Sequence, residues 1–252
     1  MKKISAVLIT KNEEHNIERC LNSLKFADEI VVYDTGSTDR TVEICEKNNC
    51  VVFKTDKWDG FGIAKRTAVS FASNDWVFVI DADEEVSEAL NHYLESFKKN
   101  ENTLYAYRIK RTSYYLNKRI KYSGWQRDYT LRLFNRKYAN FNEKIVHESV
   151  VCTTPIGHVK ALLLHYPYPH LQIHINKTML YAKLGGQQAF DKGKKSGVCY
   201  AILNGISKFL KMYIFNLGFL DGKEGLILAI NSAFSNYLKY VYLWEKREGK
   251  NE

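Results

Sequence analysis

The sequence predicts an α/β fold: a mostly parallel sheet flanked by helices, followed by a C-terminal helical extension. Over about the first hundred residues, short apolar strand patterns alternate with helical patterns, which is typical of parallel strands joined by right-handed crossovers. From about residue 104, polar and apolar residues alternate as in strands with one solvated face. Beyond about residue 176, the pattern is helical.

Four strands and four helices are expected in the first part of the chain. Short apolar and β-branched runs mark the strands, at Ile4 to Thr10, Glu29 to Asp34, Cys50 to Lys54 and Trp76 to Asp81. Apolar residues at helical spacing mark three of the helices, at Ile17 to Leu24, Phe61 to Ala72 and Leu90 to Phe97. The remaining helix follows Gly36, with Ser37 or Thr38 as its expected N-cap.

The sequence pattern changes in the later part of the chain. Tyr105 to Ile109 and Tyr129 to Leu133 alternate as further strands. Tyr200 to Leu220 and Gly225 to Trp244 read as helices with wide apolar faces and narrow polar ones. Such helices either pack against one another and the rest of the protein, or dock on a bilayer surface with their lysines above it. The pattern alone leaves both interpretations open.

Composition excludes several protein classes. With 45% hydrophobic and 26% charged residues among 252, the chain is neither disordered nor fibrous. Five Cys residues without a CxxC pair argue against a zinc site and a disulfide framework. The apolar run after Met1 reaches only Ile9, so we expect no secretory signal. The longest segment without a charged side chain is too short to span a membrane, so we expect a cytoplasmic protein.

The net charge of +9 is unevenly distributed. Residues 1–107 carry 13 basic and 19 acidic groups, whereas residues 108–144 carry 11 basic and 2 acidic ones. Residues 145–252 carry 13 basic and 7 acidic groups. An acidic first part and a basic second part suggest that the second part meets an anionic partner, such as an anionic membrane surface or a phosphorylated acceptor.

Polar, acid-containing clusters follow three of the expected strands. They are Thr10 to Glu13, Asp34 to Asp39, and Asp81 to Glu85. Because ligands of open parallel sheets bind outside the carboxyl ends of the strands, we expect these clusters to meet at one edge. Neither GxGxxG nor GxxxxGK[ST] is present, which excludes a simple dinucleotide site and a P-loop ATPase.

The triplet Asp81, Ala82 and Asp83 is the most informative of these clusters. In an extended segment, residues two apart point to the same side. Two such carboxylates can hold a hard divalent cation that takes its other ligands from water and substrate phosphate oxygens. The alternative is a solvated acidic turn that precedes a helix near Ser87.

Several segments together resemble a known family. ITKNEEHNIERCLNSL, VVYDTGSTDRT and DWVFVIDADEE are similar to motifs of the inverting glycosyltransferases with the GT-A fold (family 2). RDYTLRLFNR, KIVHESV, LLLHYPY and GFLDGKEGLILAINSAFSNYLKYVYLWE resemble the branch of lipopolysaccharide and lipooligosaccharide core β-1,4-glucosyltransferases. The resemblance covers nearly the whole chain. It implies a GT-A-like, nucleotide-diphospho-sugar transferase fold.

The resemblance also implies donor-binding roles. Thr10, Asn12 and Glu13 stand where the family contacts the nucleoside, and Asp34 where a carboxylate hydrogen-bonds the uracil ring. Lys65 stands near the base and diphosphate, although it could instead be a solvent-facing helix lysine. Many relatives carry Asn after this lysine, whereas this chain has Arg66.

The same resemblance places a Mg²⁺ or Mn²⁺ cofactor at the Asp81-Ala82-Asp83 segment. Asp81 stands where the ribose and metal are met, and Asp83 where the metal is bound directly; Ala82 belongs to the same donor-binding segment. His165 follows an apolar strand and is a third candidate ligand. A lone His is more often structural, so the alternative for His165 is a structural role.

Asp128 is the candidate catalytic base. It stands among basic residues and matches the position where the branch places an acid before its RLF strand. Inversion needs a base that deprotonates the acceptor hydroxyl on the face opposite the leaving diphosphate. The alternative is that Asp128 only pairs with Arg127 or Arg132. His147 and Glu148 are expected to orient Asp128 or the acceptor.

These expectations combine into a metal-dependent inverting hexosyltransferase. The donor is expected to be a UDP-sugar, with glucose as the hexose, and the acceptor a membrane-anchored glycolipid such as the lipopolysaccharide inner core. Residues 1–175 form the expected catalytic domain, with a nucleotide-sugar half at 1–103 and an acceptor half at 104–175. Residues 176–252 form the helical extension, and the enzyme is expected to be peripheral on the inner face of the cytoplasmic membrane.

Three alternatives remain at this point. A polyprenyl-phosphate glycosyltransferase would share the donor motifs but often carries transmembrane helices. A nucleotidyltransferase would share the sheet but consume a nucleoside triphosphate. A basic nucleic-acid-binding module would use the Tyr-rich basic segment for stacking and phosphate contact. The acidic edge of the sheet argues against nucleic acid as a partner.

Overall fold

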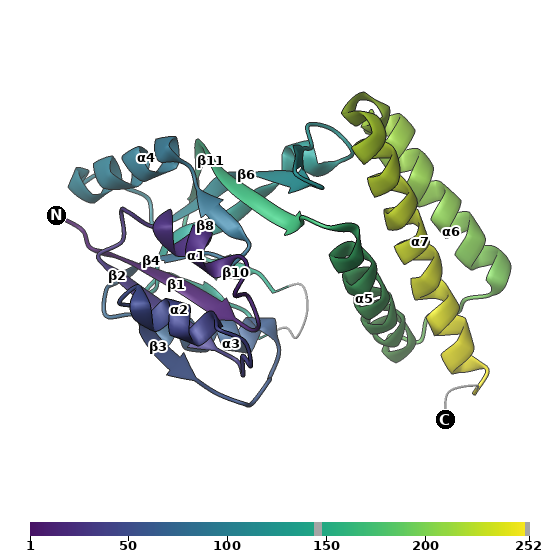
Figure 1. Cartoon of the computed structure of the whole chain (residues 1–252), viewed down its shortest axis with the longest axis horizontal. Helices are drawn as coiled ribbons and strands as arrows, with labels where there is room; N and C mark the ends of the chain where they lie inside the picture. Colours follow the sequence, from purple (N-terminus) through teal and green to yellow (C-terminus); the bar gives the residue numbers. More distant parts are fainter. Residues whose placement is uncertain (144–147, 250–252) are drawn as a thin grey trace. The chain divides into compact units, whose positions relative to one another are not determined.

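The structure, a computed structural model, describes residues 1–143 and 148–249. The chain divides into two compact units (Figure 1). The first, here called the sheet unit, comprises Met1–Arg111 and Asp128–His165. The second, the helical unit, comprises Thr112–Arg127 and Tyr166–Glu252.

Four parallel strands form one half of the large sheet. They run in the order β3-β2-β1-β4. Their bounds are β1 (Ile4–Thr10), β2 (Glu29–Asp34), β3 (Val51–Lys54) and β4 (Trp76–Val79). This confirms the expected α/β fold with a mostly parallel first part. The central strand β1 places Thr10 opposite Asp34 of β2, so the loops after these two strands start side by side.

Antiparallel strands extend the sheet beyond β4. The order continues β8-β6-β11-β5, and β7 pairs with β6. A separate two-stranded sheet pairs β9 with β10. The bounds are β5 (Glu84–Val86), β6 (Ala106–Tyr115), β7 (Lys118–Arg119), β8 (Tyr129–Asn135), β9 (Ala139–Phe141), β10 (Val150–Cys152) and β11 (Ile156–Tyr168).

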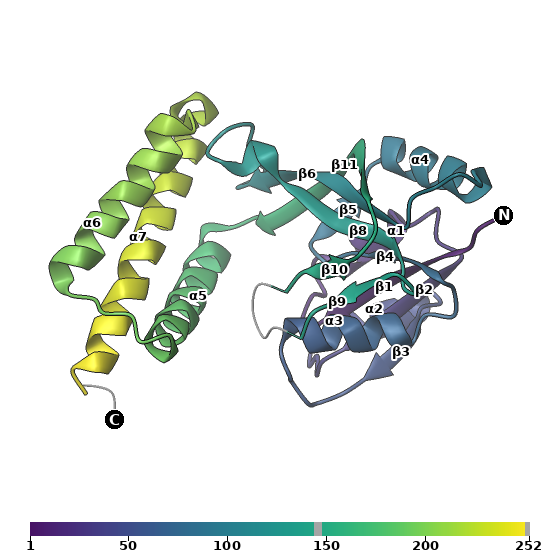
Figure 2. The same ribbon diagram turned by 180° about the vertical axis from the view of Figure 1, so that it is seen from behind.

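Helices cover both faces of the parallel strands. They are α1 (Ile17–Asn22), α2 (Thr41–Lys47), α3 (Phe61–Ser70) and α4 (Glu88–Lys99). Ile4, Ala6 and Leu8 of β1 pack into the core that α1, α2 and α4 share, whereas Val7 packs into the core beneath α3. Figures 1 and 2 show α1 and α2 on one face and α3 on the other. Because successive side chains of a strand point to opposite faces of the sheet, β1 contributes residues to both cores.

One expected helix start is wrong. Helix α2 begins at Thr41, and neither Ser37 nor Thr38 is its N-cap. The Ser37 hydroxyl and the Thr38 N–H instead bond to Asn12 of the preceding loop. Because these groups hold the neighbouring loop, the chain cannot also use them to start the helix, and Asp39 accepts the Thr41 N–H in their place.

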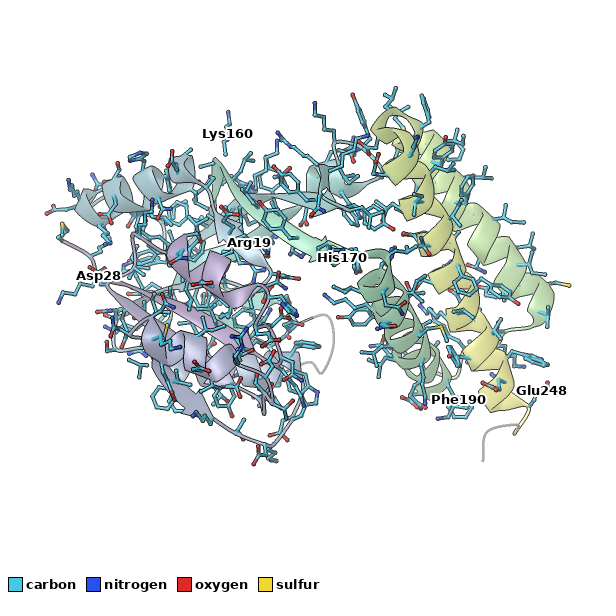
Figure 3. The ribbon with its side chains drawn as sticks, viewed as in Figure 1. Arg19, Asp28, Lys160, His170, Phe190 and Glu248 are labelled. Atoms are coloured by element: carbon cyan, nitrogen blue, oxygen red, sulfur yellow. The ribbon has the colours of Figure 1, made fainter. Side chains whose placement is uncertain are left out.

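The helical unit contains three long helices. They are α5 (Leu171–Asp191), α6 (Val198–Leu210) and α7 (Gly222–Arg247). Short helical turns are η1 (Trp125–Arg127), η2 (Lys211–Phe215) and η3 (Gly218–Asp221). Helix α7 packs against both α5 and α6, as both views show (Figures 1 and 2). Near the C-terminal ends of α5 and α7, the Lys246 ammonium lies 5.4 Å from the centre of the Phe190 ring, which Figure 3 labels.

Glycines permit the close approach of these helices. A Cβ at Gly186 of α5 would stand 2.8 Å from the Tyr242 side chain and 3.0 Å from the Lys239 carbonyl of α7. A Cβ at Gly205 of α6 would stand 3.2 Å from Tyr237 of α7. These small residues let the α7 backbone lie close to both neighbours, which explains why glycine interrupts two otherwise regular helices.

One stretch of the described chain is long and apolar enough to cross a membrane, judged by length and composition alone. It is Val198–Phe215, which comprises α6 and η2. The sequence expectation did not count it because Lys208 and Lys211 interrupt it.

A buried histidine belongs to the aromatic core of the helical unit. His174 is 4% exposed, and its Nδ1 lies 2.8 Å from the Tyr115 hydroxyl oxygen. Its ring stacks on Tyr168 at 4.2 Å between centres. Burial, with a smaller contribution from Lys177, lowers the pKa of His174 to about 4. The imidazole is therefore neutral in the folded protein at neutral pH.

We expect the free energy of unfolding to fall as the pH drops from about 6.5 to about 4, because the unfolded chain protonates this histidine first. The loss attributable to His174 should approach roughly 3.4 kcal/mol and level off below the folded-state pKa. Urea unfolding at pH 7 and pH 4.5 checks this with wild type and His174→Gln. The variant should lose less stability on acidification, and an equal loss in both proteins would contradict the assignment.

Candidate functional site

Hydrogen bonds that involve side chains join the loop after β1 to the loop after β2. The Asn12 Oδ1 accepts the Thr38 N–H at 2.8 Å, and the Asn12 N–H donates to the Ser37 hydroxyl at 2.9 Å. The Glu13 N–H donates to the Thr41 hydroxyl at 2.8 Å. Asn12 adopts a left-handed conformation, with φ of 55°, that Asn tolerates better than most residues. The structure thus brings two of the expected nucleoside-contacting residues onto one rigid edge.

Asp34 stabilises the ends of β1 and β2 through its carboxylate. Its carboxylate is 2% exposed and accepts hydrogen bonds from the Thr10 hydroxyl, the Gly36 and Ser37 N–H groups and the Ser37 hydroxyl. Both carboxylate oxygens are therefore engaged by protein donors. Gly36 adopts a φ of 92°, which lets the chain turn back over the carboxylate. A uracil N–H would have to compete with these donors for Asp34.

Asp81 lies between two buried cations. Its Oδ1 is 2.9 Å from the Lys65 Nζ and its Oδ2 is 2.5 Å from an Arg132 Nη. Burial alone would raise the pKa of Asp81, but Arg132 and then Lys65 hold it well below its ordinary value. Lys65, only 6% exposed, also contacts Glu148 at 2.9 Å, so the alternative of a solvent-facing lysine is wrong. Asp81 is consequently an anion with both oxygens in ion pairs.

A fully buried carboxylate continues this arrangement. Glu84 is 0% exposed, and its Oε1 lies 2.6 Å from Arg132 and 3.0 Å from Arg111. Its Oε2 accepts the Asp81 N–H at 3.0 Å. Arg111 in turn lies 2.7 Å from Asp128. The result is a row of alternating charges, here called the charge chain, that runs Lys65–Asp81–Arg132–Glu84–Arg111–Asp128.

Asp128 ends the charge chain at the start of β8. Its Oδ2 pairs with Arg111 of β6, rather than with Arg127 or Arg132. Its carbonyl also accepts the Arg111 N–H at 2.8 Å, so the backbone position is fixed from both sides. Within residues 1–143 and 148–249, the other carboxylate oxygen, Oδ1, accepts no hydrogen bond. The side chain is 30% exposed and can reach a ligand.

Comparisons with known proteins agree with this architecture. Residues 5–159 match the family described as "Glycosyl transferase family 2". An uncharacterized glycosyltransferase of Rickettsia typhi is 33% identical over 97% of this chain and 88% of its own length. The chain belongs to glycosyl transferase family 2. The resemblance seen in the sequence motifs is thereby confirmed.

Two further comparisons concern the branch and the fold. The lipopolysaccharide core biosynthesis glycosyltransferase LpsC of Rhizobium meliloti is 27% identical over 96% of this chain and 92% of its own length. The crystal structure of TarS from S. aureus aligns with a TM-score of 0.50 and 21% identity, over 71% of this chain and 39% of that longer one. The likeness to TarS confirms the GT-A-like α/β fold expected for a family 2 enzyme.

The family implies a divalent metal, and the candidate ligands lie near the end of β4. Asp83 and His165 approach each other to 3.6 Å between Oδ2 and Nε2. A carboxylate and an imidazole at this separation fit a cation that takes its remaining ligands from water and phosphate oxygens. No group of three or more Asp, Glu, His or Cys residues poised for a metal exists in the described part of the chain. Asp81 does not fit as arranged, because Lys65 and Arg132 engage both of its oxygens.

The site residues therefore fall into two sets. One set contains Thr10, Asn12, Glu13 and Asp34 on the interlocked loops. The other contains Lys65, Asp81 and, through the charge chain, Asp128. No described contact joins Asp34 to Asp81. The expectation that their side chains form one pocket stays a prediction.

Other expected residues have definite positions. The Ala82 side chain is buried in the core, so only its backbone is available to a donor. Arg66 is exposed and lies 3.3 Å from Glu143. Glu148 contacts Lys65 rather than Asp128, and His147 lies outside the described residues.

Sequence reasoning missed Glu84 and Arg111, and it named Arg132 only as a partner of Asp128. Arg111 lies between Lys110 and Thr112, and Arg132 lies between Leu131 and Leu133. Both arginines fit strands with one solvated face, so the sequence pattern does not mark them as buried cations.

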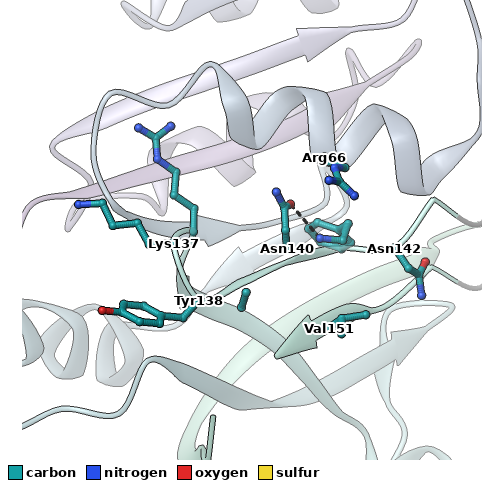
Figure 4. A pocket seen from close by; sticks show the side chains of 9 residues that line it. Arg66, Lys137, Tyr138, Asn140, Asn142 and Val151 are labelled. Atoms are coloured by element: carbon teal, nitrogen blue, oxygen red, sulfur yellow. Dashed lines mark hydrogen bonds between the residues drawn. The ribbon is translucent and has the colours of Figure 1, made fainter. Parts of the chain in front are cut away.

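A shallow pocket lies elsewhere on the sheet unit, near α3, β8 and β9 (Figure 4). It has a volume of about 340 Å³, and its lining includes Arg66, Arg136 and Lys137. Each of these cations already has protein partners: Glu143 for Arg66, Asp75 for Lys137, and backbone carbonyls for Arg136. None of the expected donor or catalytic residues lines this pocket.

We expect Glu84→Gln to destabilise the protein by roughly 3 to 5 kcal/mol, because the buried Arg132 and the partly buried Arg111 would lose their shared anion. An amide in place of the carboxylate would also turn an NH₂ group toward a donor. Chemical unfolding measures the change. Glu88→Gln, the same substitution at an exposed position of α4, is the matched control and should change stability by less than about 1 kcal/mol. Equal effects of the two substitutions would show that the charge chain is dispensable for stability.

Proposed function

We propose that this family 2 glycosyltransferase transfers a hexose, expected to be glucose, from a UDP-sugar to a membrane-anchored glycolipid with inversion. The observation that carries the proposal is the charge chain, which connects Asp81 at the sheet edge to Asp128. Family membership supplies the reaction class. The charge chain supports a donor side and a base side held in one rigid arrangement.

Donor binding follows from the interlocked loops and the cations. Thr10, Asn12 and Glu13 offer polar groups to a nucleoside at the end of the parallel strands. Lys65 and Arg132 lie beside Asp81, where carboxylates already pair with both of them. Asp34 supports the loop edge, whether or not it also meets the uracil ring.

Charge balance supports a metal requirement. The charge chain and Glu148 contribute four carboxylates against three cations, so they carry no surplus positive charge for a diphosphate. Asp83 and His165 would hold Mg²⁺ or Mn²⁺, and such a cation, when bound, offsets the charge that develops on the leaving diphosphate. Asp81 would join the metal ligands only by exchanging one of its ion-pair partners.

Asp128 is the proposed general base. Arg111 fixes its Oδ2, which leaves Oδ1 to accept the proton of the acceptor hydroxyl. A single displacement opposite the leaving group gives inversion at the anomeric carbon. The pairing with Arg111 orients the carboxylate before the acceptor arrives.

The acceptor proposal rests on the relative LpsC, whose name specifies lipopolysaccharide core biosynthesis. The helical unit adds physical support, because it carries 16 basic against 6 acidic residues, a net charge of +10. Helix α6 and the η2 turn expose Leu203, Ile206, Leu210 and Phe215 to solvent. Apolar side chains next to lysines suit docking on an anionic membrane surface, and we place the enzyme on the inner face of the cytoplasmic membrane.

The apolar stretch Val198–Phe215 also favours a second candidate, a polyprenyl-phosphate acceptor. The two acceptors give separable products: a glycosylated core saccharide or a prenol-linked sugar. Incubating the enzyme with labelled UDP-glucose and each acceptor identifies which product forms.

We expect Asp128→Asn to retain UDP-sugar binding and to lose at least about 100-fold in turnover, because an amide cannot accept the proton. Asp75→Asn, an exposed aspartate of the sheet unit, is the control and should keep normal turnover. Donor binding is measured by calorimetry and turnover by UDP release. Loss of donor binding in Asp128→Asn would reassign the residue to the donor site, and normal turnover would remove it from the mechanism.

Metal dependence is tested by binding rather than by activity alone. We expect Mn²⁺ or Mg²⁺ to strengthen UDP binding, measured as a rise in melting temperature, and EDTA to abolish the effect. Asp83→Ala should fold normally and lose the metal-dependent part of the shift. Glu88→Ala serves as the control. An undiminished metal effect in Asp83→Ala would place the cation elsewhere.

A further inference from the structure

A second pocket lies entirely within the helical unit, between α5, α6 and α7. Its volume is about 290 Å³. Its lining is largely polar, and consists of Tyr168, His174, Thr178, Tyr181, Ala182, Lys208, Ser232, Ser235, Asn236 and Lys239. Neither aspartate nor glutamate lines it.

The helices present these groups as regular stripes. Ser232, Ser235, Asn236 and Lys239 follow the i, i+3, i+4, i+7 spacing of one face of α7. One face of α5 contributes His174, Thr178, Tyr181 and Ala182 at similar helical spacing, and α6 contributes Lys208. The narrow polar stripes of the late helices thus turn inward to one cavity. A bundle that needed only packing would place apolar residues at these positions.

Two lysines in the lining lack an anionic partner among the described residues. Lys208 and Lys239 form no hydrogen bond or ion pair with any residue in the ranges 1–143 and 148–249, and the Lys239 ammonium lies 5.4 Å from the centre of the Tyr240 ring. The contrast is clear with Lys65, Lys98 and Lys118, each of which lies within 3.2 Å of a carboxylate. A partly buried cation without an anion is costly, so these lysines are expected to have a ligand.

Lys239 is also held in place. The methylenes of Lys239 lie where a Cβ on Gly185 would meet them at 3.3 Å, so its stem packs against the α5 backbone. The Asn236 amide donates to the Asn204 carbonyl at 2.9 Å and ties α7 to α6 next to Lys208. Burial, with repulsion from Lys211, lowers the pKa of Lys208.

We propose that this pocket binds a phosphate group. Two ammonium groups and the hydroxyls of Thr178, Ser232 and Ser235 provide charge-assisted and neutral donors for phosphate oxygens. The volume is near the lower limit of roughly 300 Å³ for small-molecule pockets, which suits a phosphate with a small attached group rather than a saccharide chain. The phosphate belongs either to a lipid headgroup or to a free phosphate ester. The proposal does not depend on the glycosyltransferase reaction.

Binding is tested on the full-length protein with defined probes. Inorganic phosphate and sn-glycerol 3-phosphate are titrated by calorimetry at constant ionic strength. Vesicles of phosphatidylcholine, with and without phosphatidic acid, are tested by co-sedimentation. The pocket variant is Lys208→Gln with Lys239→Gln. The matched control is Lys183→Gln with Lys194→Gln, which removes the same charge from exposed positions of the same unit.

The pocket variant should bind the soluble phosphates at least about tenfold more weakly than wild type, because two charge-assisted contacts are lost. The control should bind like wild type. Phosphate should raise the melting temperature of wild type and of the control, but not of the pocket variant. Because the variant removes uncompensated charges, its own melting temperature should not fall.

The vesicle experiment identifies the source of the bound phosphate group. Binding that requires phosphatidic acid and is lost in the pocket variant, without binding of soluble phosphates, assigns a lipid headgroup. Binding of soluble phosphates alone assigns a free ester. No binding of any probe to wild type, or equal binding by the pocket variant and the control, overturns the proposal.

Discussion

The buried carboxylate of Glu84 is the contact on which the rest of the site depends. It compensates Arg111 and Arg132, and its second oxygen holds the backbone of Asp81. These four residues come from the loop after β4 and from β5, β6 and β8, so one side chain fixes the relation of strands that are distant in sequence. A buried carboxylate between two arginines tolerates little movement, because every displacement leaves a charge unpaired in a medium of low dielectric constant.

Much of the fold could be predicted from the sequence because local patterns decide it. Apolar runs located the four parallel strands, and helical spacing located α1, α3 and α4 to within a few residues. The start of α2 was missed for a nonlocal reason: Ser37 and Thr38 serve Asn12 of another loop instead of their own helix. Capping preferences describe a helix in isolation, and they fail where tertiary partners compete for the same groups.

The candidate site was predictable in its residue types but not in its partners. Carboxylates at strand ends indicated an anionic edge, yet their pairing with cations depends on which strands become neighbours. Asp81 was expected to meet the ribose and the metal, and the structure pairs it with Lys65 and Arg132. Asp34 was expected to hydrogen-bond the uracil ring, and it accepts four protein hydrogen bonds. Both ligand contacts stay predictions. Composition cannot reveal such pairings, because arginines on β6 and β8 reach these acids only in the folded sheet.

The two units treat charge in opposite ways, and this difference indicates a division of tasks. The sheet unit carries 21 basic and 22 acidic residues, and its buried cations are matched by carboxylates. The helical unit carries its surplus of positive charge partly in a cavity, on Lys208 and Lys239, without matching acids. A balanced network favours rigidity for chemistry, since none of its members gains by moving. An unbalanced one favours an external anion, since only a ligand can complete it.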